Sequence, residues 1–169
     1  MTKFKMSTPM RNNIVLGVDP GFDRVGVAIL EKEKVLFSDC IETNRKLPHQ
    51  KRLLQIGEGI RKIISKWQPQ ELAIESLFFN QNITNGIRVA EARGIVIYES
   101  AKAGLDVYEY SPQAVKVGVT GYGKADKKQM EAMIKKLVKL PKQSSKRLDD
   151  EVDAIALGIT HLASKRTAS

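Results

Sequence analysis

Four acidic side chains stand at the ends of predicted secondary-structure elements, where together they could bind metal. Asp19 closes the apolar run IVLGV and precedes a Pro-Gly turn, and Glu75 closes the apolar segment LAIE. Asp150 and Asp153 lie in the segment LDDEVDAIALGITHLA. Carboxylates that are brought together repel one another unless they are protonated or bridged by a cation. A cluster of these acids therefore predicts a cation site.

The donor type indicates which cation and which reaction. Sets of carboxylate oxygens favour hard ions, and Mg²⁺ in particular, with Mn²⁺ as a substitute. Two such ions about 4 Å apart can activate a water and stabilise the leaving oxygen of a phosphodiester. Each acid also has an ordinary use, because Asp is common in turns and at helix N-termini, where Asp149 could be the N-cap. Their joint position at element edges favours a metal-dependent nuclease.

Charge and composition agree with a nucleic-acid substrate. The 169 residues contain 28 Lys and Arg against 19 Asp and Glu, a net charge of +9 with a pI near 9.7. Basic proteins of this kind often bind polyanions. Residues 124–147 are rich in Lys and contain only two acids. The absence of a run of about 18 apolar residues predicts a soluble protein. The single cysteine, Cys40, is expected to be a buried thiol in a reducing compartment.

The hydrophobic periodicity predicts which elements hold the acids in place. Strands are expected at 14–19, 25–31, 35–42, 71–76 and 106–112, and helices at 48–67, 83–103, 126–140 and 149–164. This order predicts an α/β fold in which an antiparallel meander and parallel strands form a mixed sheet flanked by helices. If the strands that end at Asp19 and Glu75 are parallel neighbours, both carboxylates lie at one edge. The expected domain is 13–165, between a disordered basic extension at 1–12 and a tail at 166–169.

The last helix sets the remaining two acids beside its apolar face. We expect that face to contain Leu148, Val152, Ile155, Ile159 and Leu162. Asp150 and Asp153 are three positions apart and can converge above the first turn. Asp149 and Asp153 share a face almost as well, so both pairs remain open. His49 and His161 have no metal-ligand spacing, and we expect His161 to act only as a favourable charge near a helix end.

A glycine-rich segment resembles a nucleotide-binding loop but lacks its chemistry. Gly118 to Ala125, GVTGYGKA, matches G-x-x-x-x-G-K, but it has Ala where the P-loop needs Ser or Thr. It also follows an expected helix and not a strand. We therefore exclude ATP binding and expect a glycine loop that directs Lys124, Lys127 or Lys128 at a phosphate of DNA.

Taken together, these motifs resemble those of the RuvC-type Holliday-junction resolvases. The matching segments are GVDPG, AIESLF, ARG, GYGKADKKQM, KLP and DDEVDAIALGITH, in family order over residues 14–163. The resemblance implies an RNase-H-like fold and a homodimer. It also implies paired, symmetric nicking of four-way DNA junctions in recombination and repair by Mg²⁺-dependent hydrolysis. A cytoplasmic, nucleoid-associated protein is expected.

Individual roles follow from the same resemblance. It places the metal ligands, two ions per site, at Asp19, Glu75, Asp150 and Asp153. Lys116 and Lys127 would lie near the scissile phosphate, and Lys127 would stabilise developing charge. Phe78 would stack on a base opened at the junction centre. Phe79 is the alternative, and either ring could instead belong to the core.

Partners are also implied. The helix at 83–103 has Ile83, Ile87, Ala90, Gly94, Ile97 and Ala101 on one face. Its small residues, Gly86, Ala90, Ala92 and Gly94, permit close approach of a second copy, or they pack on the protein's own sheet. A twofold dimer would match the dyad of a junction. A branch-migration helicase complex of the RuvA/RuvB type is implied by resemblance only.

Three other classes of protein share part of this pattern. An RNase-H-like nuclease that acts on RNA or on an RNA–DNA hybrid would keep the acids. A non-catalytic protein that binds branched DNA would not need them. A sugar kinase or actin-like ATPase needs two such domains, for which 169 residues are too few.

Overall fold

The computed structural model, which describes residues 13–77, 83–143 and 146–167, is built on a five-stranded sheet. Its strands are β1 (Ile14–Asp19), β2 (Arg24–Glu31), β3 (Lys34–Glu42), β4 (Glu71–Glu75) and β5 (Asp106–Tyr110). They lie in the order β3-β2-β1-β4-β5. β1, β2 and β3 pair antiparallel, whereas β4 pairs parallel with both β1 and β5. The predicted mixed sheet is therefore confirmed.

Five helices connect and cover these strands. They are α1 (His49–Trp67), α2 (Ile83–Lys102), α3 (Pro112–Thr120), α4 (Lys127–Leu137) and α5 (Asp149–Thr167). The hydroxyl of Ser111 caps α3 by accepting from the backbone N–H of Ala114. Asp126 and Gln129 form a capping box at the start of α4. These caps satisfy N–H groups that have no partner inside the helix, and so they fix where α3 and α4 begin.

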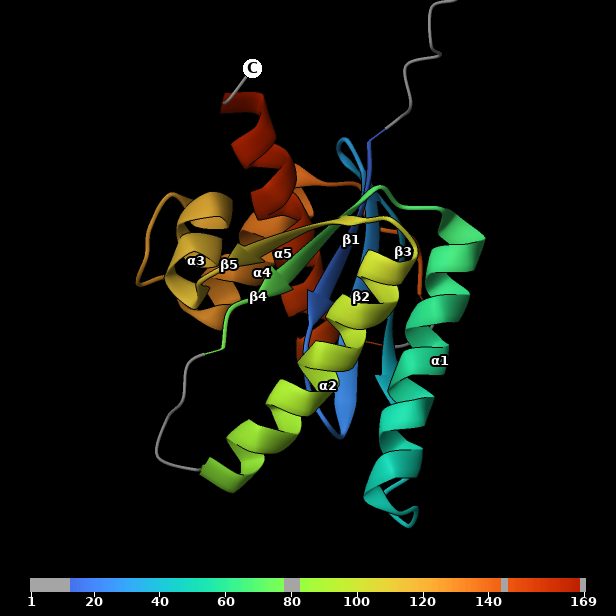
Figure 1. The fold of residues 1–169 in the computed structure, drawn as a ribbon. Helices are drawn as coiled ribbons and strands as arrows, with labels where there is room; N and C mark the ends of the chain where they lie inside the picture. Colours follow the sequence, from blue (N-terminus) through green and yellow to red (C-terminus); the bar gives the residue numbers. More distant parts are fainter. Residues whose placement is uncertain (1–12, 78–82, 144–145, 168–169) are drawn as a thin grey trace, which may run out of the picture.

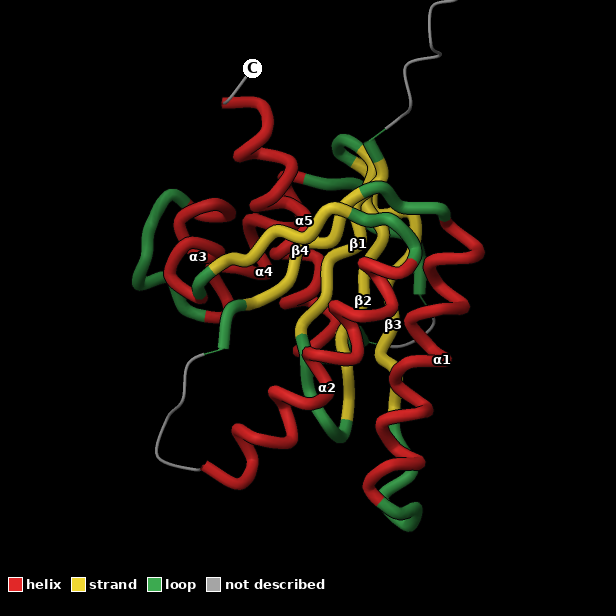
Figure 2. The backbone as a smooth tube through the Cα atoms, in the orientation of Figure 1, coloured by secondary structure: helices red, strands yellow, loops and turns green. Residues whose placement is uncertain are grey.

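The helices enclose the sheet in two layers, with α1 and α2 on one face and α3, α4 and α5 on the other (Figures 1 and 2). Alternation along the strands explains the two cores. Leu16 and Val18 of β1 pack toward α1 and α2, whereas Val15 packs toward α5. The first long helix meets the sheet through the residues that its periodicity predicts, among them Ile56 and Ile60, both fully buried.

α5 lies between the sheet and helices α3 and α4, and it is buried on more sides than the sequence pattern indicates. Ile155 and Ile159 are buried as expected, but Ala154 and Leu157 are buried as well. The predicted apolar face is less buried toward its ends, where Leu148 is exposed and Val152 and Leu162 are half-buried. Close contact with the sheet is possible because β1 has Gly17 here, where a Cβ would lie 2.2 Å from the carbonyl oxygen of Ala154.

α2 presents much of its predicted apolar face to solvent. Ile87 is 52% exposed and Tyr98 is 59% exposed, and a Cβ on Gly94 would meet no described atom within 4 Å. The inward face consists instead of Ala92 and Val96, both fully buried. Of the small residues named above, Ala92 therefore packs in the protein's own core, whereas Gly94 faces outward.

Two predictions about single side chains are wrong. His161 is not an exposed charge near a helix end, because it is completely buried under β4 and β5. Its Nε2 lies 2.8 Å from Oε2 of Glu71 and its Nδ1 lies 2.7 Å from the hydroxyl of Tyr110. Cys40 is half-buried and not fully buried. Burial, together with the nearby acids of α5, raises the pKa of its thiol to about 12, so the thiol is protonated at neutral pH.

The ends of the chain differ slightly from the predicted boundaries. α5 continues to Thr167, past the expected domain end at 165. The basic extension predicted at residues 1–12 lies outside the described residues. Within the described part of the chain, no helix has the length and apolarity needed to cross a membrane.

Candidate active site

Asp19 and Glu75 lie side by side at one edge of the sheet. β1 and β4 are parallel neighbours, with Val18 in register with Ile74, and each strand ends at its acid one residue later. The side chain of Arg93 on α2 fixes the second strand end, because its Nε donates to the backbone oxygen of Glu75 at 3.0 Å. The sequence prediction that these two carboxylates share an edge is confirmed.

The first turn of α5 reaches this edge because β2 has a glycine there. Gly26 is paired with Asp19 across β1 and β2. A Cβ on Gly26 would lie only 1.8 Å from the backbone oxygen of Asp150, so only glycine permits this approach. Backbone contact of this kind places the acids of α5 next to the end of β1 without any intervening side chain.

Electrostatic coupling follows from this proximity. The pKa of Asp19 rises to about 8, first because the carboxyl group is buried and then because Asp153, Glu75 and Asp150 repel its charge. Burial and Asp153 also raise the pKa of Glu75. The pKa of Asp153 is raised by partial burial and by Asp149 and Asp150, against the lowering effect of Lys127. The acids predicted as metal ligands thus influence one another's charge.

Cations hold two of the acids on α5. Nε of Arg24 lies 2.9 Å from Oδ2 of Asp150, and Nζ of Lys127 lies 2.7 Å from Oδ2 of Asp149. The Lys127 contact lowers the pKa of Asp149 and raises that of Lys127 itself. In this arrangement no three His, Cys, Asp or Glu side chains of residues 13–77, 83–143 and 146–167 are grouped closely enough to hold an ion.

The donor set nevertheless fits a hard cation. Oδ2 of Asp150 is buried and makes no properly oriented hydrogen bond within the described residues, so Arg24 compensates it only as a charge. A buried carboxylate oxygen without such a bond is costly. The binding of a hard ion such as Mg²⁺ would stabilise both this oxygen, which lacks a hydrogen bond, and the ionised form of Asp19, whose pKa is raised.

A cavity of about 360 Å³ opens beside the acids, between α3, α4 and α5. Acids and lysines face each other across it. Its polar lining includes Glu75, Lys116, Asp126, Lys127, Glu131, Asp149 and Asp153. Lys116 and Lys127 therefore line the same cavity as three of the candidate acids. Asp149 lines the cavity, whereas Asp150 couples to Asp19, so both residues are still candidates for the metal ligand at the start of α5.

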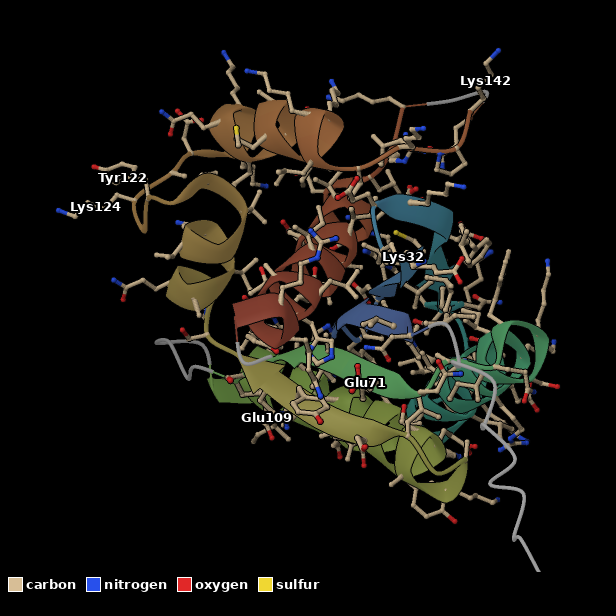
Figure 3. The ribbon with its side chains drawn as sticks, turned by 90° about the horizontal axis from the view of Figure 1, so that it is seen from above. Lys32, Glu71, Glu109, Tyr122, Lys124 and Lys142 are labelled. Carbon is tan, nitrogen blue, oxygen red and sulfur yellow. The ribbon has the colours of Figure 1, made fainter. Side chains whose placement is uncertain are left out.

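The glycine-rich segment lacks the structure of a P-loop. It follows α3 and not a strand, as expected. Thr120 holds it in a tight turn by accepting from the backbone N–H of Tyr122 at 3.1 Å, with Gly121 at φ +74°. Figure 3 shows Tyr122 and Lys124 projecting outward from this turn. Lys128 is exposed on α4, so of the three lysines named for this loop, only Lys127 contacts the acids.

The turn after Asp19 is fixed by residues that the sequence analysis did not select. Phe22 is buried, and the guanidinium of Arg52 lies 4.0 Å from its ring centroid. Arg52 also donates to Thr43 and pairs with Asp23. The available signal was spacing, because Arg52 lies four and eight positions before Ile56 and Ile60, on the face of the helix that is buried. Phe78 and Phe79, the predicted stacking residues, lie outside the described residues.

Glu151 was also missed, although it lies between the predicted ligands. It is 5% exposed and accepts from Ser38 at 2.6 Å and from Gln143 at 2.7 Å, and it pairs with Arg147 at 3.2 Å. These contacts tie the first turn of α5 to β3. Glu151 therefore positions the helix and does not face the other acids, a distinction that spacing alone could not provide.

Comparisons with known proteins give a consistent result. The family model described as "Crossover junction endodeoxyribonuclease RuvC" matches residues 15–161. Proteins of that name from Brevibacillus brevis and Thermotoga maritima are each 40% identical, over 151 and 156 residues. The first match covers 87% of this chain and 90% of the relative, and the second covers 90% and 92%.

Solved structures show the same likeness. Thermus thermophilus RuvC in complex with a Holliday junction substrate aligns with a TM-score of 0.85 at 25% identity, covering 92% of this chain and 96% of that chain. The yeast mitochondrial Holliday junction resolvase Ydc2 aligns with a TM-score of 0.63 at 13% identity, covering 96% of this chain and 85% of that chain. The second likeness concerns the fold alone.

Proposed function

Because this chain belongs to the RuvC family of crossover junction endodeoxyribonucleases, we propose that it resolves four-way DNA junctions by paired, symmetric nicks. The fold is RNase-H-like, and the chain is a nuclease of the hydrolase class. The relative solved with a Holliday junction covers nearly the whole chain and supports the junction as substrate. Recombination and repair are the processes that produce such junctions.

One observation carries the proposal. Asp19, Glu75 and the first turn of α5 meet at the carboxyl edge of the sheet, beside a cavity lined by Lys116 and Lys127. A DNA-binding protein without catalysis has no need for clustered carboxylates that raise one another's pKa, since negative charge repels phosphate. The arrangement therefore supports cleavage as well as binding.

We infer that Asp19, Glu75, Asp150 and Asp153 hold two Mg²⁺ ions, which Mn²⁺ could replace. When bound, such ions would supply an activated water and a counter-charge for the leaving oxygen. Asp19 is central to the set, because all three other acids raise its pKa. The close approach of α5 to β2 and the parallel pairing of β1 with β4 bring the other acids toward it.

Lysines complete the proposed site. Lys127 lies beside Asp149 and close enough to Asp19, Asp150 and Asp153 to influence their charge, so it can stabilise the negative charge that develops on a phosphate. Lys116 lines the same cavity. Lys124 and Lys128 are exposed and suit more distant phosphates of the DNA. Stacking of Phe78 on a base remains a proposal from the family resemblance.

We further propose that the protein acts as a homodimer through α2. The outward face of this helix carries two exposed apolar side chains, Ile87 and Tyr98, on either side of Gly94, which leaves room for a partner. A twofold dimer would present two sites to the two strands of one junction. Association with a branch-migration helicase complex of the RuvA/RuvB type is proposed from the resemblance.

The substrate is tested by incubating the full chain with a labelled four-way junction, a linear duplex of matching sequence and an RNA–DNA hybrid. Each is assayed with Mg²⁺ and with EDTA. We expect symmetric nicks in the junction alone, lost in EDTA. Cleavage of the hybrid instead would favour an RNA-directed nuclease. Binding of the junction without cleavage would favour a non-catalytic branched-DNA binder.

The dimer is tested by sedimentation of Tyr98→Glu beside Val117→Glu. Val117 is an exposed apolar residue on α3, 49% exposed, and so it controls for added charge on a different helix. We expect Tyr98→Glu to sediment as a monomer and Val117→Glu as a dimer. Dimers of equal strength in both variants would contradict the α2 interface.

A further inference from the structure

Arg24 lies at the junction between the turn that follows Asp19 and strand β2. It is the first residue of β2, and its side chain extends to the first turn of α5. There its Nε lies 2.9 Å from Oδ2 of Asp150, with the Arg24 side chain 44% exposed and the Asp150 side chain 28% exposed. An arginine thus holds an oxygen of one of the proposed metal ligands.

The contact differs from the other arginine–carboxylate pairs that fix this region. Arg52 is almost fully buried and has hydrogen bonds to Thr43 as well as its pairing with Asp23. Arg147 pairs with the buried Glu151 and donates to the backbone oxygen of Pro141 at 2.6 Å. Both arginines are anchored by several bonds in buried surroundings, so they are permanent parts of the fold.

Arg24 has no such anchoring among the described residues. Its contact with Asp150 lacks hydrogen-bond geometry, which leaves Oδ2 of Asp150 without a properly oriented donor. A partly exposed ion pair of this kind adds little to stability, so a stronger competitor can replace it. The charge of Arg24 is nevertheless useful at this place, because Asp150 lies close enough to Asp19 and Asp153 to raise their pKa values.

From these contacts we propose that Arg24 is a displaceable counter-ion of the metal site. It compensates Asp150 when no divalent cation is bound, and it must leave Oδ2 before this oxygen can coordinate an ion. Arg24 therefore competes with the metal and raises the concentration at which the site fills. This inference rests on the proposed function, since it assumes that the acid cluster binds the ion.

The competition explains why the acids are close enough to influence one another's charge yet are not grouped for coordination in the described structure. Release of Arg24 and rotation of the Asp150 side chain would bring the fourth acid to the other three. The exposed part of Arg24 gives the guanidinium a path to solvent, so the exchange needs no movement of the backbone.

The test is direct titration of the full chain with Mn²⁺ in the absence of DNA, followed by electron paramagnetic resonance of the free ion. The variants are Arg24→Gln and a matched control, Arg45→Gln. Arg45 pairs with Asp23, the residue that precedes Arg24, but neither Arg45 nor Asp23 belongs to the acid cluster. Both variants remove one positive charge, so a long-range effect of net charge would appear equally in both.

We expect Arg24→Gln to bind Mn²⁺ about fivefold more tightly than the wild type, the change that corresponds to loss of a surface ion pair of about 1 kcal/mol. Arg45→Gln should change the dissociation constant by less than about twofold. The Mg²⁺ concentration for half-maximal junction cleavage should fall in Arg24→Gln by a similar factor. Thermal melting of both variants checks that the fold is retained.

Equal affinity in Arg24→Gln and Arg45→Gln would overturn the proposal, and so would weaker binding in Arg24→Gln, which would identify Arg24 as a support for Asp150. Asp19→Asn serves as the reference for the site. If Asp19→Asn removes Mn²⁺ binding while Arg24→Gln has no effect, only the role of Arg24 fails. If Asp19→Asn leaves Mn²⁺ binding unchanged, the metal site itself is wrong and both proposals fall.

Discussion

Asp19 and Gly26 face each other across β1 and β2, and the missing side chain of Gly26 is what lets α5 approach Asp19. A Cβ at position 26 would lie 1.8 Å from the backbone oxygen of Asp150 and 2.3 Å from its carbonyl carbon. Neither atom can move without moving the first turn of α5. The position of two proposed ligands thus depends on a glycine in a neighbouring strand.

Gly26→Ala should therefore displace the start of α5 and separate its acids from Asp19. We expect a loss of about 1–3 kcal/mol of unfolding free energy, typical of overpacking in a core, and loss of most junction cleavage. Urea unfolding and a cleavage assay measure the two effects. A variant with wild-type stability and full activity would show that α5 does not pack against β2 in this way.

The pH dependence of stability should reveal the burial of Asp19. Its pKa rises from 3.8 to about 8 in the folded protein, so the native state favours the protonated carboxyl group. The stabilising effect is complete below about pH 4 and is lost as pH rises through 8. Without metal, the protein should be less stable at pH 9 than at pH 5 because of this group.

Asp19→Asn isolates that contribution, since the amide cannot ionise. The measured quantity is the free energy of unfolding of the variant minus that of the wild type, in EDTA. This difference should be at least about 2 kcal/mol larger at pH 9 than at pH 5, given about 1.4 kcal/mol for each pKa unit. Thermal melts at the two pH values provide the comparison. A difference that does not change with pH would mean that Asp19 is ionised freely in the folded state.

A second carboxylate, the buried Glu71, should make stability depend on pH in the opposite direction. Burial alone would raise the pKa of Glu71, but hydrogen bonds from Lys165, His161 and Asn13 outweigh it and lower the pKa from 4.5 to about 2. Its stabilising effect is therefore present above about pH 4.5 and lost as pH falls toward 2. Glu71 begins β4, which lies between β1 and β5 in the sheet, and it is labelled in Figure 3.

Glu71→Gln should destabilise the protein by about 2–4 kcal/mol at pH 7, because it leaves the buried His161 and the amine of Lys165 without their carboxylate. This loss of unfolding free energy should become smaller as the pH falls toward 3. Glu33→Gln is the control, because its pair with Arg166 is largely exposed, and a change below about 0.5 kcal/mol is expected. Equal effects of the two substitutions would show that the Glu71 network is not a buried one.

Much of the fold and part of the site could be predicted from the sequence for an identifiable reason. Strand ends are local features, so Asp19 and Glu75 could be located from the apolar runs that precede them. Contacts between residues that are distant in the chain could not be predicted in this way. His161 lies next to Glu71, 90 positions away in the chain, and periodicity contains no information about such a pair. Arg24 and Glu151 acquire their roles only when β2, β3 and α5 meet.

The face of α2 shows the same limit in another form. An apolar face with Ile87 and Gly94 could be read from helical spacing, but spacing does not say whether the face meets the sheet or another molecule. In the structure Ile97 of this face packs against the core, whereas Ile87 is exposed and a Cβ on Gly94 would meet no described atom within 4 Å. Amphipathicity predicts that a helix has a partner, and only the packing of the other elements shows which face is already covered.

The choice between Asp149 and Asp150 can be settled by paired substitution. Asp150 couples to Asp19 and has a buried oxygen without a hydrogen bond, whereas Asp149 is paired with the exposed Lys127. We expect Asp150→Asn to reduce cleavage by more than about 100-fold, beyond the 10- to 100-fold typical of losing an outer partner of a metal ligand. Asp149→Asn should reduce it by less than about tenfold. The reverse order would assign the ligand to Asp149.

The measurement that tests the central claim most directly compares junction binding and junction cleavage by Asp19→Asn. Gel-shift titration in EDTA and a cleavage assay in Mg²⁺ are carried out on the same preparation. Cleavage should disappear, whereas binding should be retained or strengthened, because a negative charge that faces phosphate is removed. Cleavage at the wild-type rate, or loss of binding in a folded variant, would contradict the assignment of Asp19 as the centre of the metal site.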